Sequence, residues 1–268
     1  QIANPQAFAL HPRLAWGFYG HRLALYRQTV PHAGFALLQQ FAAALPQGAF
    51  VYTSNVDGQF QAAGFDAQRI VECHGSIHHL QCMDGCGGAI WPADEFQPFI
   101  DAEQCHLTSA LPLCPHCGGL ARPNILMFGD WGWLSRRSDE QEARRHAWLR
   151  GVKRLVSIEI GAGTHIPTVR LLGERLSKSL IRINPNEAQV PAGQGVPLAC
   201  GGLAGLQALV QRFPDSLETQ RALVSACIRQ GQTAMGLSAI GQLARKDPQL
   251  LDNPEVVQFL TAAALSNR

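Results

Sequence analysis

The sequence lacks the features of membrane and exported proteins. No run of about 18 apolar residues is present, so no transmembrane helix is predicted. The first residues, Gln1 to Pro5, show neither the basic nor the apolar segment of a signal peptide. We therefore expect a cytoplasmic protein whose eight cysteines serve as thiols or metal ligands rather than disulfides.

An excess of one charge is also missing. Lys and Arg total 22 against 20 for Asp and Glu, a net charge of +2. Nucleic-acid binding requires clustered positive charge. The one basic cluster, Arg136-Arg137 with Arg144-Arg145, is interleaved with acidic residues and indicates a solvated helix face. We expect neither nucleic acid nor a membrane as a partner.

Apolar residues make up 46% of the chain, enough for a buried core. Their spacing predicts helices through residues 6–45, with a break at Pro31-His32. Short strands are predicted over Ala49–Thr53 and Ile70–Gly75, and a helix over Ser138–Arg150.

The clearest unit follows at residues 155–184. A strand over Leu155–Ile160 leads through the turn Gly161–Thr164 into a helix over Pro167–Lys178 and a second strand over Leu180–Asn184. This pattern is typical of a βαβ unit with a glycine-rich first turn. One more strand, Val196–Cys200, and a helix, Leu203–Phe213, are predicted after it.

The last residues differ in character, because three short amphipathic helices are predicted over 217–229, 233–245 and 254–266. We expect them to form an appendage on the main domain and to offer a possible surface for a protein partner. The predicted class is α/β, a Rossmann-like parallel sheet with an inserted small zinc-ribbon module. The predicted parts are residues 1–79 and 124–213 for the sheet domain, 80–123 for the module and 214–268 for the appendage.

Four cysteines form the strongest local pattern. Cys82 and Cys86 are separated by three residues, and Cys114 and Cys117 by two. Two such pairs can place four thiolates tetrahedrally around one zinc ion, and four sulfurs leave no open position for catalysis. We predict one structural zinc; the alternative is unliganded thiols.

The turn Gly161-Ala162-Gly163 lies between a strand and a helix, where backbone N–H groups can face a phosphate. Asn184 ends the next strand about 20 residues later, where a ribose partner commonly lies. The third glycine of the dinucleotide fingerprint is absent, so an ordinary βα turn remains an alternative.

Polar residues Ser54–Asp57 follow the first predicted strand, at the edge where parallel sheets bind ligands. They can equally form a turn. His74 follows the second predicted strand, and a lone histidine is more often structural than catalytic. We expect His78 and His79 to be non-catalytic.

The order and spacing of these groups resemble the sirtuin family of NAD-dependent protein deacylases. The family's T-Q-N-I-D-x-L-H-x-x-A-G stretch resembles Thr53–Gly64, and its H-G-S resembles His74–Ser76. After two cysteine pairs, its G-G-x-x-R-P-x-x-x-x-F-G-E resembles Gly118–Asp130. Its G-T-S turn and later I-N resemble Gly161–Gly163 and Ile183-Asn184. The match covers about residues 10 to 210.

This resemblance implies a cleft in which an acyl-lysine peptide meets NAD. The acyl oxygen attacks the ribose carbon that carries nicotinamide, nicotinamide leaves, and the acyl group passes to ADP-ribose. By resemblance, His74 is the general base, which suits an imidazole because its pKa lies near neutral pH. Asn55 orients the ribose and a water, and Asp57 holds the nicotinamide amide.

The remaining roles also follow from the resemblance. Phe128 and Gly129 line the peptide groove and pair with an extended substrate. Ser54 lies at the nicotinamide end, and the adenosine half is held by Gly161, Ala162, Gly163 and Asn184.

The sequence departs from the family pattern at several positions. Ser54 replaces Gln, Gln59 and Phe60 replace L-H, and Asp130 replaces Glu. In the family, a first element precedes the helix that here contains Gly17–Tyr19: a glycine-rich strand–turn and a loop over NAD, about 40 to 50 residues in all. We expect either that this sequence is a fragment that lacks this element or that the protein has lost part of the NAD site. Two alternatives to deacylation stay open: ADP-ribosyl transfer or NAD hydrolysis on this fold, and a non-catalytic zinc-containing interaction module.

Overall fold

The computed structural model describes residues 2–43, 45–212, 224, 228, 233–244 and 247–266. The chain separates into two compact units, each described here by itself: unit 1 is Gln1–Pro31 with Phe50–Gly151, and unit 2 is His32–Ala49 with Val152–Arg268. Within the described residues, no helix has the length and apolarity needed to cross a membrane. The domain boundaries predicted from the sequence remain predictions.

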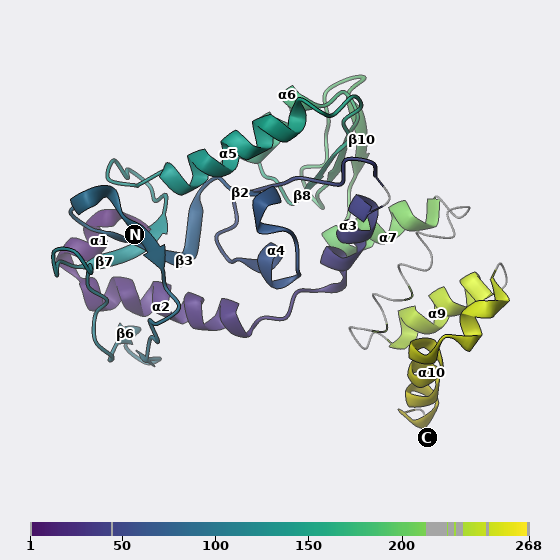
Figure 1. Ribbon diagram of the computed structural model, residues 1–268, viewed down its shortest axis with the longest axis horizontal. Coiled ribbons are helices and arrows are strands. Elements are labelled where there is room, and N and C mark those ends of the chain that lie inside the picture. The colour runs from purple at the N-terminus through teal and green to yellow at the C-terminus, as the bar shows by residue number, and fades with distance from the viewer. Residues whose placement is uncertain are drawn as a thin grey trace. The chain divides into compact units, whose positions relative to one another are not determined.

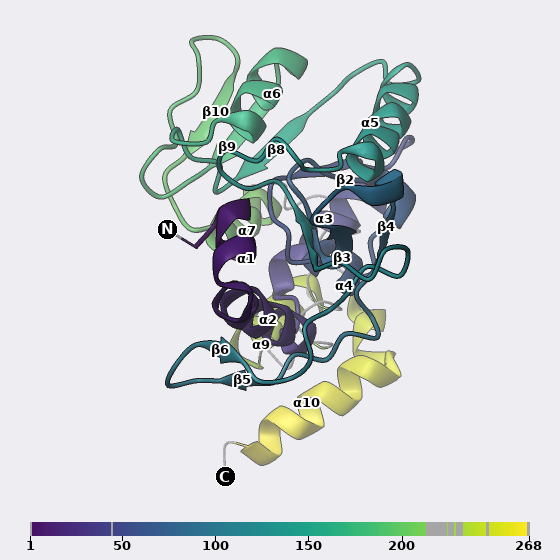
Figure 2. The ribbon, with the colours of Figure 1, turned by 90° about the vertical axis from the view of Figure 1, so that its left-hand side faces the viewer.

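Unit 1 begins with two helices, α1 (Pro5–Leu10) and α2 (Pro12–Gln28). Each has a proline in its first turn, where the missing N–H is not needed. α2 lies along β5 (Ile100–Asp101) and β6 (His106–Leu107), as Figure 2 shows. Gly17 permits this approach, because a Cβ there would lie 1.8 Å from the Cys105 carbonyl oxygen.

Two small sheets complete the frame of unit 1. β1 (Val51–Thr53) pairs in parallel with β2 (Ile70–Glu72). In the second sheet, β3 (Gly75–Cys82) lies between β4 (Ile90–Pro92) and β7 (Ala121–Ile125), and both pairings are antiparallel. Three further elements are α4 (Gln59–Ala62), η1 (Ala67–Arg69) and η2 (Cys86–Gly88).

The second predicted strand, Ile70–Gly75, is shorter in the structure and is followed by one that the sequence did not predict. β2 ends at Glu72, and β3 starts at Gly75 after a two-residue turn. Gly75 has φ +79°, and a Cβ there would lie 2.0 Å from the Asn124 carbonyl oxygen. This close crossing turns the chain, so His74 lies between two strands rather than inside one.

A long helix, α5 (Arg136–Leu149), lies along β2 (Figure 1). The core of unit 1 gathers apolar side chains from α1, α2, β3 and β7, including Phe8, Trp16, Leu23 and Ile77. The Trp16 indole Nε1–H donates to the Ala121 carbonyl at 3.0 Å, which ties α2 to β7.

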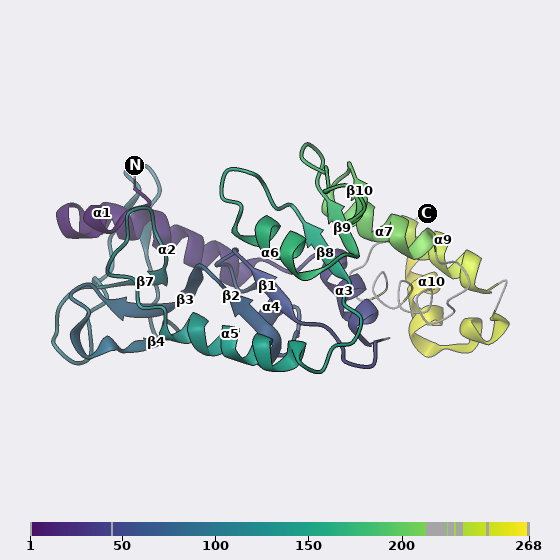
Figure 3. The same cartoon turned by 90° about the horizontal axis from the view of Figure 1, so that it is seen from above.

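Unit 2 contains the predicted βαβ unit. β8 (Ser157–Ile160), α6 (Thr168–Leu176) and β9 (Leu180–Ile183) follow in order, and β9 pairs in parallel with both β8 and β10 (Gly195–Leu198). Figure 3 shows α6 beside β8. The prediction of a parallel α/β sheet is confirmed here.

Helices α3 (Ala33–Ala43) and α7 (Gly202–Arg212) pack together in the core of unit 2, around Leu37, Ile183 and Leu206. The later elements α9 (Thr233–Ala244), η3 (Pro248–Asp252) and α10 (Pro254–Ser266) share a cluster of their own. They confirm two of the predicted terminal helices. Most of the third, over 217–229, lies outside the described residues.

Candidate functional site

The predicted site residues fall into two groups, one in each unit. In unit 1 they follow the carboxyl ends of β1 and β2 or lie in the loop after β7. In unit 2 they lie in the turn after β8 and at the end of β9. The two groups are Ser54, Asn55, Asp57, His74, Phe128 and Gly129 in unit 1, and Gly161, Ala162, Gly163 and Asn184 in unit 2.

The carboxyl ends of β1 and β2 are held together beyond the strands themselves. The Cys73 N–H donates to the Thr53 carbonyl at 2.9 Å, which continues the parallel ladder. The Thr53 hydroxyl accepts from the Asn55 N–H at 3.0 Å, and Asn55 is exposed. The structure thus brings Asn55 and His74 to neighbouring strand ends, as expected for a parallel sheet edge.

The loop after β1 is fixed to β3. The Ile77 N–H donates to the Val56 carbonyl at 2.9 Å, and the His78 Nε2 lies 2.9 Å from the Asp57 carbonyl. The Asp57 Oδ1 accepts from the Gln59 N–H at 3.0 Å. Asp57 therefore shapes the turn with one carboxylate oxygen, and His78 is engaged in backbone support.

Two departures from the family pattern have structural partners. The buried Gln59 donates through Nε2 to the carbonyls of Tyr26 (3.2 Å) and Thr29 (3.4 Å) at the end of α2. Phe60 packs edge-on against Phe65, with ring centroids 5.2 Å apart. These side chains connect the loop after β1 to its surroundings, so their replacement does not by itself indicate a changed chemistry.

His74 is half-buried. Burial lowers the pKa of its imidazole, while a hydrogen bond with the Ser54 backbone raises it, and the net shift is downward. Its carbonyl accepts from the Leu126 N–H at 2.9 Å. The lowered pKa favours the neutral ring, which is the form that accepts a proton.

Glu72, two residues before His74, is fixed by α5. Its carboxylate accepts hydrogen bonds from Arg137 and Gln141, its N–H donates to the Gln141 Oε1 at 3.0 Å, and its carbonyl accepts from the Ser138 hydroxyl at 2.8 Å. Glu72 is 1% exposed. Helix α5 thereby sets the position of the strand end that leads into His74.

The loop after β7 is organised around Asp130. Its carboxylate forms a bidentate pair with Arg122 at 2.7 and 2.8 Å, and both side chains are almost fully buried. The same carboxylate accepts from the N–H groups of Met127 (3.3 Å) and Gly132 (3.2 Å). The third departure, Asp for Glu, thus retains an acid that neutralises Arg122.

The predicted peptide-binding positions lie in this loop. Phe128 is 58% exposed and Gly129 is exposed. The Phe128 N–H donates to the Ala3 carbonyl at 3.3 Å, so this donor already has a partner in the chain. Within the described residues, the backbone of Gly129 has no protein hydrogen-bond partner, and it adopts φ +66° in a turn. Its pairing with an extended peptide stays a prediction.

The four predicted metal ligands meet. Their sulfurs all lie within 4.8 Å of one another, with Cys82–Cys117 at 3.7 Å and Cys86–Cys114 at 3.4 Å. Sulfurs around a tetrahedral zinc, each bonded at about 2.3 Å, lie about 3.8 Å apart. The cluster therefore has the dimensions of a zinc site.

The thiols of the cluster share their protons. Burial raises the pKa of Cys114, but backbone hydrogen bonds from Cys117 and His116 outweigh it and lower that pKa to about 6, whereas hydrogen bonds to the other three sulfurs raise the pKa of Cys86. A thiolate is the form that binds metal. Cys105 lies outside this group.

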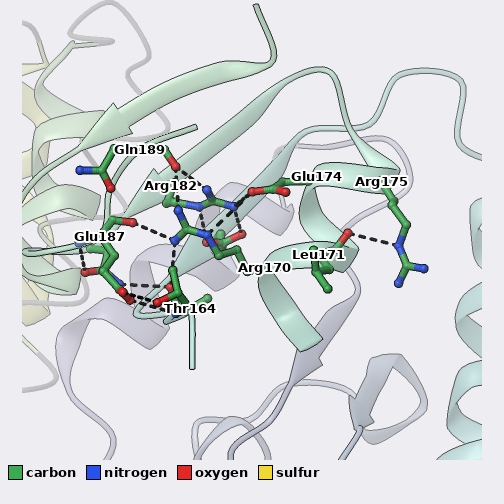
Figure 4. A network of polar contacts seen from close by, with 11 residues as sticks. Thr164, Arg170, Leu171, Glu174, Arg175, Arg182, Glu187 and Gln189 are labelled. Atoms are coloured by element: carbon green, nitrogen blue, oxygen red, sulfur yellow. Dashed lines mark hydrogen bonds and ion pairs between the residues drawn. The ribbon is translucent and has the colours of Figure 1, made fainter. Parts of the chain in front are cut away.

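The turn after β8 is bound by a carboxylate from the loop after β9, Glu187, which the sequence did not single out. Glu187 accepts from the Thr164 N–H at 3.0 Å and from the Thr164 hydroxyl at 2.5 Å, as Figure 4 shows. The Thr164 hydroxyl lowers the pKa of this carboxyl group. An acidic residue soon after the second strand of a βαβ unit is the signal that identifies such a group.

Asn184 supports the same region. Its Nδ2 donates to the Ala162 carbonyl at 3.2 Å, and its Oδ1 accepts from the N–H groups of Asn186 and Glu187, both at 2.9 Å. The amide of Asn184 therefore orders the loop that presents Glu187. Whether Asn184 also contacts adenosine stays a prediction.

Two arginines, Arg170 and Arg182, donate to backbone carbonyls of this loop (Figure 4). Arg170 donates to the carbonyls of Glu187 and Gln189, both at 2.9 Å. The buried Arg182 pairs with Glu159 and Glu174. This network fixes the backbone between β9 and β10, so the Glu187 carboxylate is preorganised over the turn.

Comparison with known proteins agrees with this architecture. A profile of the Sir2 family matches residues 1–143, just over half of the chain. The NAD-dependent protein deacylase of Aquifex aeolicus is 28% identical over 193 residues, covering 71% of this chain and 72% of that protein.

Solved structures show the same fold. A Sir2 homologue in complex with NAD superposes with a TM-score of 0.58 at 23% identity, covering 79% of this chain and 75% of the other. A Sir2 bound to acetylated peptide gives a TM-score of 0.57 at 17% identity, covering 79% and 82%. With the family profile spanning most of unit 1, the chain belongs to the Sir2 (sirtuin) family.

Proposed function

We propose that the protein is an NAD-dependent protein lysine deacylase, which releases nicotinamide and transfers the acyl group to ADP-ribose. The observation that supports this most is the placement of the half-buried His74, whose pKa burial lowers, at the strand edge that also carries Asn55 and Asp57. The catalytic roles of these three residues are our proposal and come from the family pattern.

NAD, when bound, supplies an electrophilic ribose carbon and nicotinamide as the leaving group. In our proposal, the neutral imidazole of His74 accepts the proton of a ribose hydroxyl. Asn55, which is exposed after the neighbouring strand end, orients the ribose and a water. Asp57 offers its second carboxylate oxygen to the nicotinamide amide, since the first accepts from the Gln59 N–H. Ser54 provides the surrounding backbone.

The unit 2 residues fit the adenosine half. The Glu187 carboxylate over the turn Gly161–Gly163 can accept from ribose hydroxyls and would repel a phosphate placed there. Within the described residues, the N–H groups of Ala162 and Gly163 have no protein acceptor. We assign ribose binding to Glu187 and Asn184. We assign backbone contacts with the adjoining part of NAD to the turn Gly161–Gly163.

We assign one structural zinc to Cys82, Cys86, Cys114 and Cys117. The sulfur separations support this, and four protein sulfurs leave no coordination position for catalysis. The zinc joins η2 and the end of β3 to the segment before β7.

Nicotinamide release tests the proposal. Purified protein is incubated with NAD, with and without an acetyl-lysine peptide, and His146→Ala, which alters an exposed histidine of α5, is the matched control for His74→Ala. Peptide-dependent release that His74→Ala abolishes is the expected result. Release without peptide would instead establish ADP-ribosyl transfer or NAD hydrolysis, and no release would leave a non-catalytic module.

A further inference from the structure

The loop after β7 exposes a tryptophan almost completely. Trp131 is 99% exposed, and Phe128, three residues earlier, is 58% exposed. Burying a large apolar side chain stabilises a folded protein, so leaving both of these side chains exposed forgoes stability. A single exposed apolar residue needs no explanation, but the setting of Trp131 supplies further evidence.

The backbone around Trp131 is held firmly on both sides. Asp130 before it is clamped by Arg122, and the Gly132 carbonyl after it accepts from the buried Gln81 Nε2 at 2.8 Å. Two residues farther on, the Leu134 N–H donates to the Gln81 Oε1 at 3.1 Å. Trp131 is therefore presented by ordered backbone, which reduces the entropy lost when a ligand contacts it.

A second tryptophan in the same loop is less exposed than Trp131. Trp133, two residues later, is partly buried, and its indole Nε1 is enclosed. Trp131 faces solvent although its near neighbour does not. Large aromatic side chains on ordered backbone are typical of binding hot spots.

The position of Trp131 relates it to the proposed peptide-binding position. Gly129 lies two residues before it. An extended peptide advances about 3.3 Å per residue, so a chain paired at Gly129 passes within side-chain reach of Trp131. We propose that Trp131 is a specificity-determining residue that binds an aliphatic or aromatic side chain flanking the acyl-lysine of the substrate. This rests on the proposed deacylase function.

The charges of the loop favour an apolar partner. Asp130 is the only ionisable residue from 126 to 134, and it is buried and paired with Arg122. No carboxylate of this loop is left to attract a basic peptide side chain. The indole face then contributes mainly apolar contact and ring stacking.

The test uses acetyl-lysine peptides with one varied residue at each of three positions on either side of the acetyl-lysine. Alanine, leucine, tryptophan, arginine and aspartate are compared by kcat/KM. Trp131→Ala and Trp131→Phe are compared with wild type, and Phe99→Ala is the matched control because Phe99 is also an exposed aromatic, at 68%.

At one flanking position, leucine or tryptophan should raise kcat/KM about tenfold over alanine, equivalent to about 1.4 kcal/mol. Trp131→Ala should reduce that ratio to about one, Trp131→Phe should retain part of it, and Phe99→Ala should leave it unchanged. Equal ratios in wild type and Trp131→Ala, or a preference for arginine through the indole face, would overturn the proposal.

Peptide binding without NAD separates this inference from the proposed function. The indole N–H resonance of Trp131, identified by its loss in Trp131→Phe, should shift on adding a leucine-flanked peptide and not an aspartate-flanked one. Turnover without this shift would overturn the role of Trp131 alone. A shift without turnover would overturn the deacylase function while the binding role stands.

Discussion

His74 illustrates how single residues carry the proposed chemistry. Its ring is half-buried beside the Ser54 backbone, and burial lowers the pKa of the imidazole. A base must be neutral to act, so a lowered pKa extends the active range toward acid. The surroundings of the ring, rather than the identity of the residue, determine this behaviour.

We predict that the acid limb of the kcat/KM profile lies below pH 6.5, the usual pKa of a histidine. As pH falls through the His74 pKa, the ring gains a proton and activity declines. His74→Ala should lower turnover by at least about 100-fold, the usual scale of general-base catalysis, with an unchanged circular dichroism spectrum. Retained activity in this variant would remove His74 from the role of base.

Glu187 makes a related point in unit 2. Its carboxylate lies on the turn only because Thr164, Asn184 and Arg170 together shape the chain after β9. No single residue of this group indicates a ribose site by itself. Their arrangement places a hydrogen-bond acceptor, the Glu187 carboxylate, at the turn.

At the scale of elements, the loop after β7 depends on one buried ion pair. Arg122 and Asp130 leave almost no side-chain surface exposed, and the Asp130 carboxylate also accepts from two backbone N–H groups of the loop. A buried pair is costly to break, because removing one partner leaves the other charge unpaired.

We predict that Asp130→Asn destabilises the protein by roughly 3–5 kcal/mol, since Arg122 loses its counter-charge. Urea denaturation followed by circular dichroism measures this. Asp139→Asn, which alters an exposed carboxylate near the start of α5, is the control and should change stability by less than about 1 kcal/mol. Equal effects of the two substitutions would contradict the assigned importance of the pair.

The contact between α5 and β2 is a second organising feature at this scale. Three residues of α5 bind Glu72 through its carboxylate, N–H and carbonyl. Glu72 ends β2, and the turn with His74 begins immediately after it. The helix therefore contributes to the site by fixing a strand end, without itself lying at the chemistry.

At the scale of the whole molecule, the proposed zinc site is the main cross-link between distant segments of the chain. It joins Cys82 and Cys86 to Cys114 and Cys117, and 27 residues lie between Cys86 and Cys114. Small modules with few apolar residues rely on metal for folding energy.

We predict about one zinc per chain and its loss on prolonged treatment with a strong chelator, with partial unfolding of unit 1. Cys114→Ser should reproduce this effect, and Cys105→Ser should not, because Cys105 lies outside the four-sulfur group. Elemental analysis and thermal denaturation give the readouts. A fully folded protein without metal would contradict the structural role.

The sequence by itself determined much of this protein. The order of an apolar segment, a glycine-rich turn, a helical segment and a second apolar segment predicted the βαβ unit of β8, α6 and β9, because such patterns depend only on neighbouring residues. The spacing of Cys82, Cys86, Cys114 and Cys117 predicted a four-sulfur group, because zinc geometry constrains ligand spacing. Ordered short motifs indicated the family.

Tertiary structure decided the rest. The start of β3 at Gly75 depends on the close approach of the Asn124 backbone, 49 positions farther along the chain. The roles of Gln59, Asp130 and Glu187 depend on partners brought close by folding: the end of α2, Arg122 and Thr164. Local patterns report a residue's neighbours in sequence, whereas hydrogen bonds, burial and pKa depend on its neighbours in space.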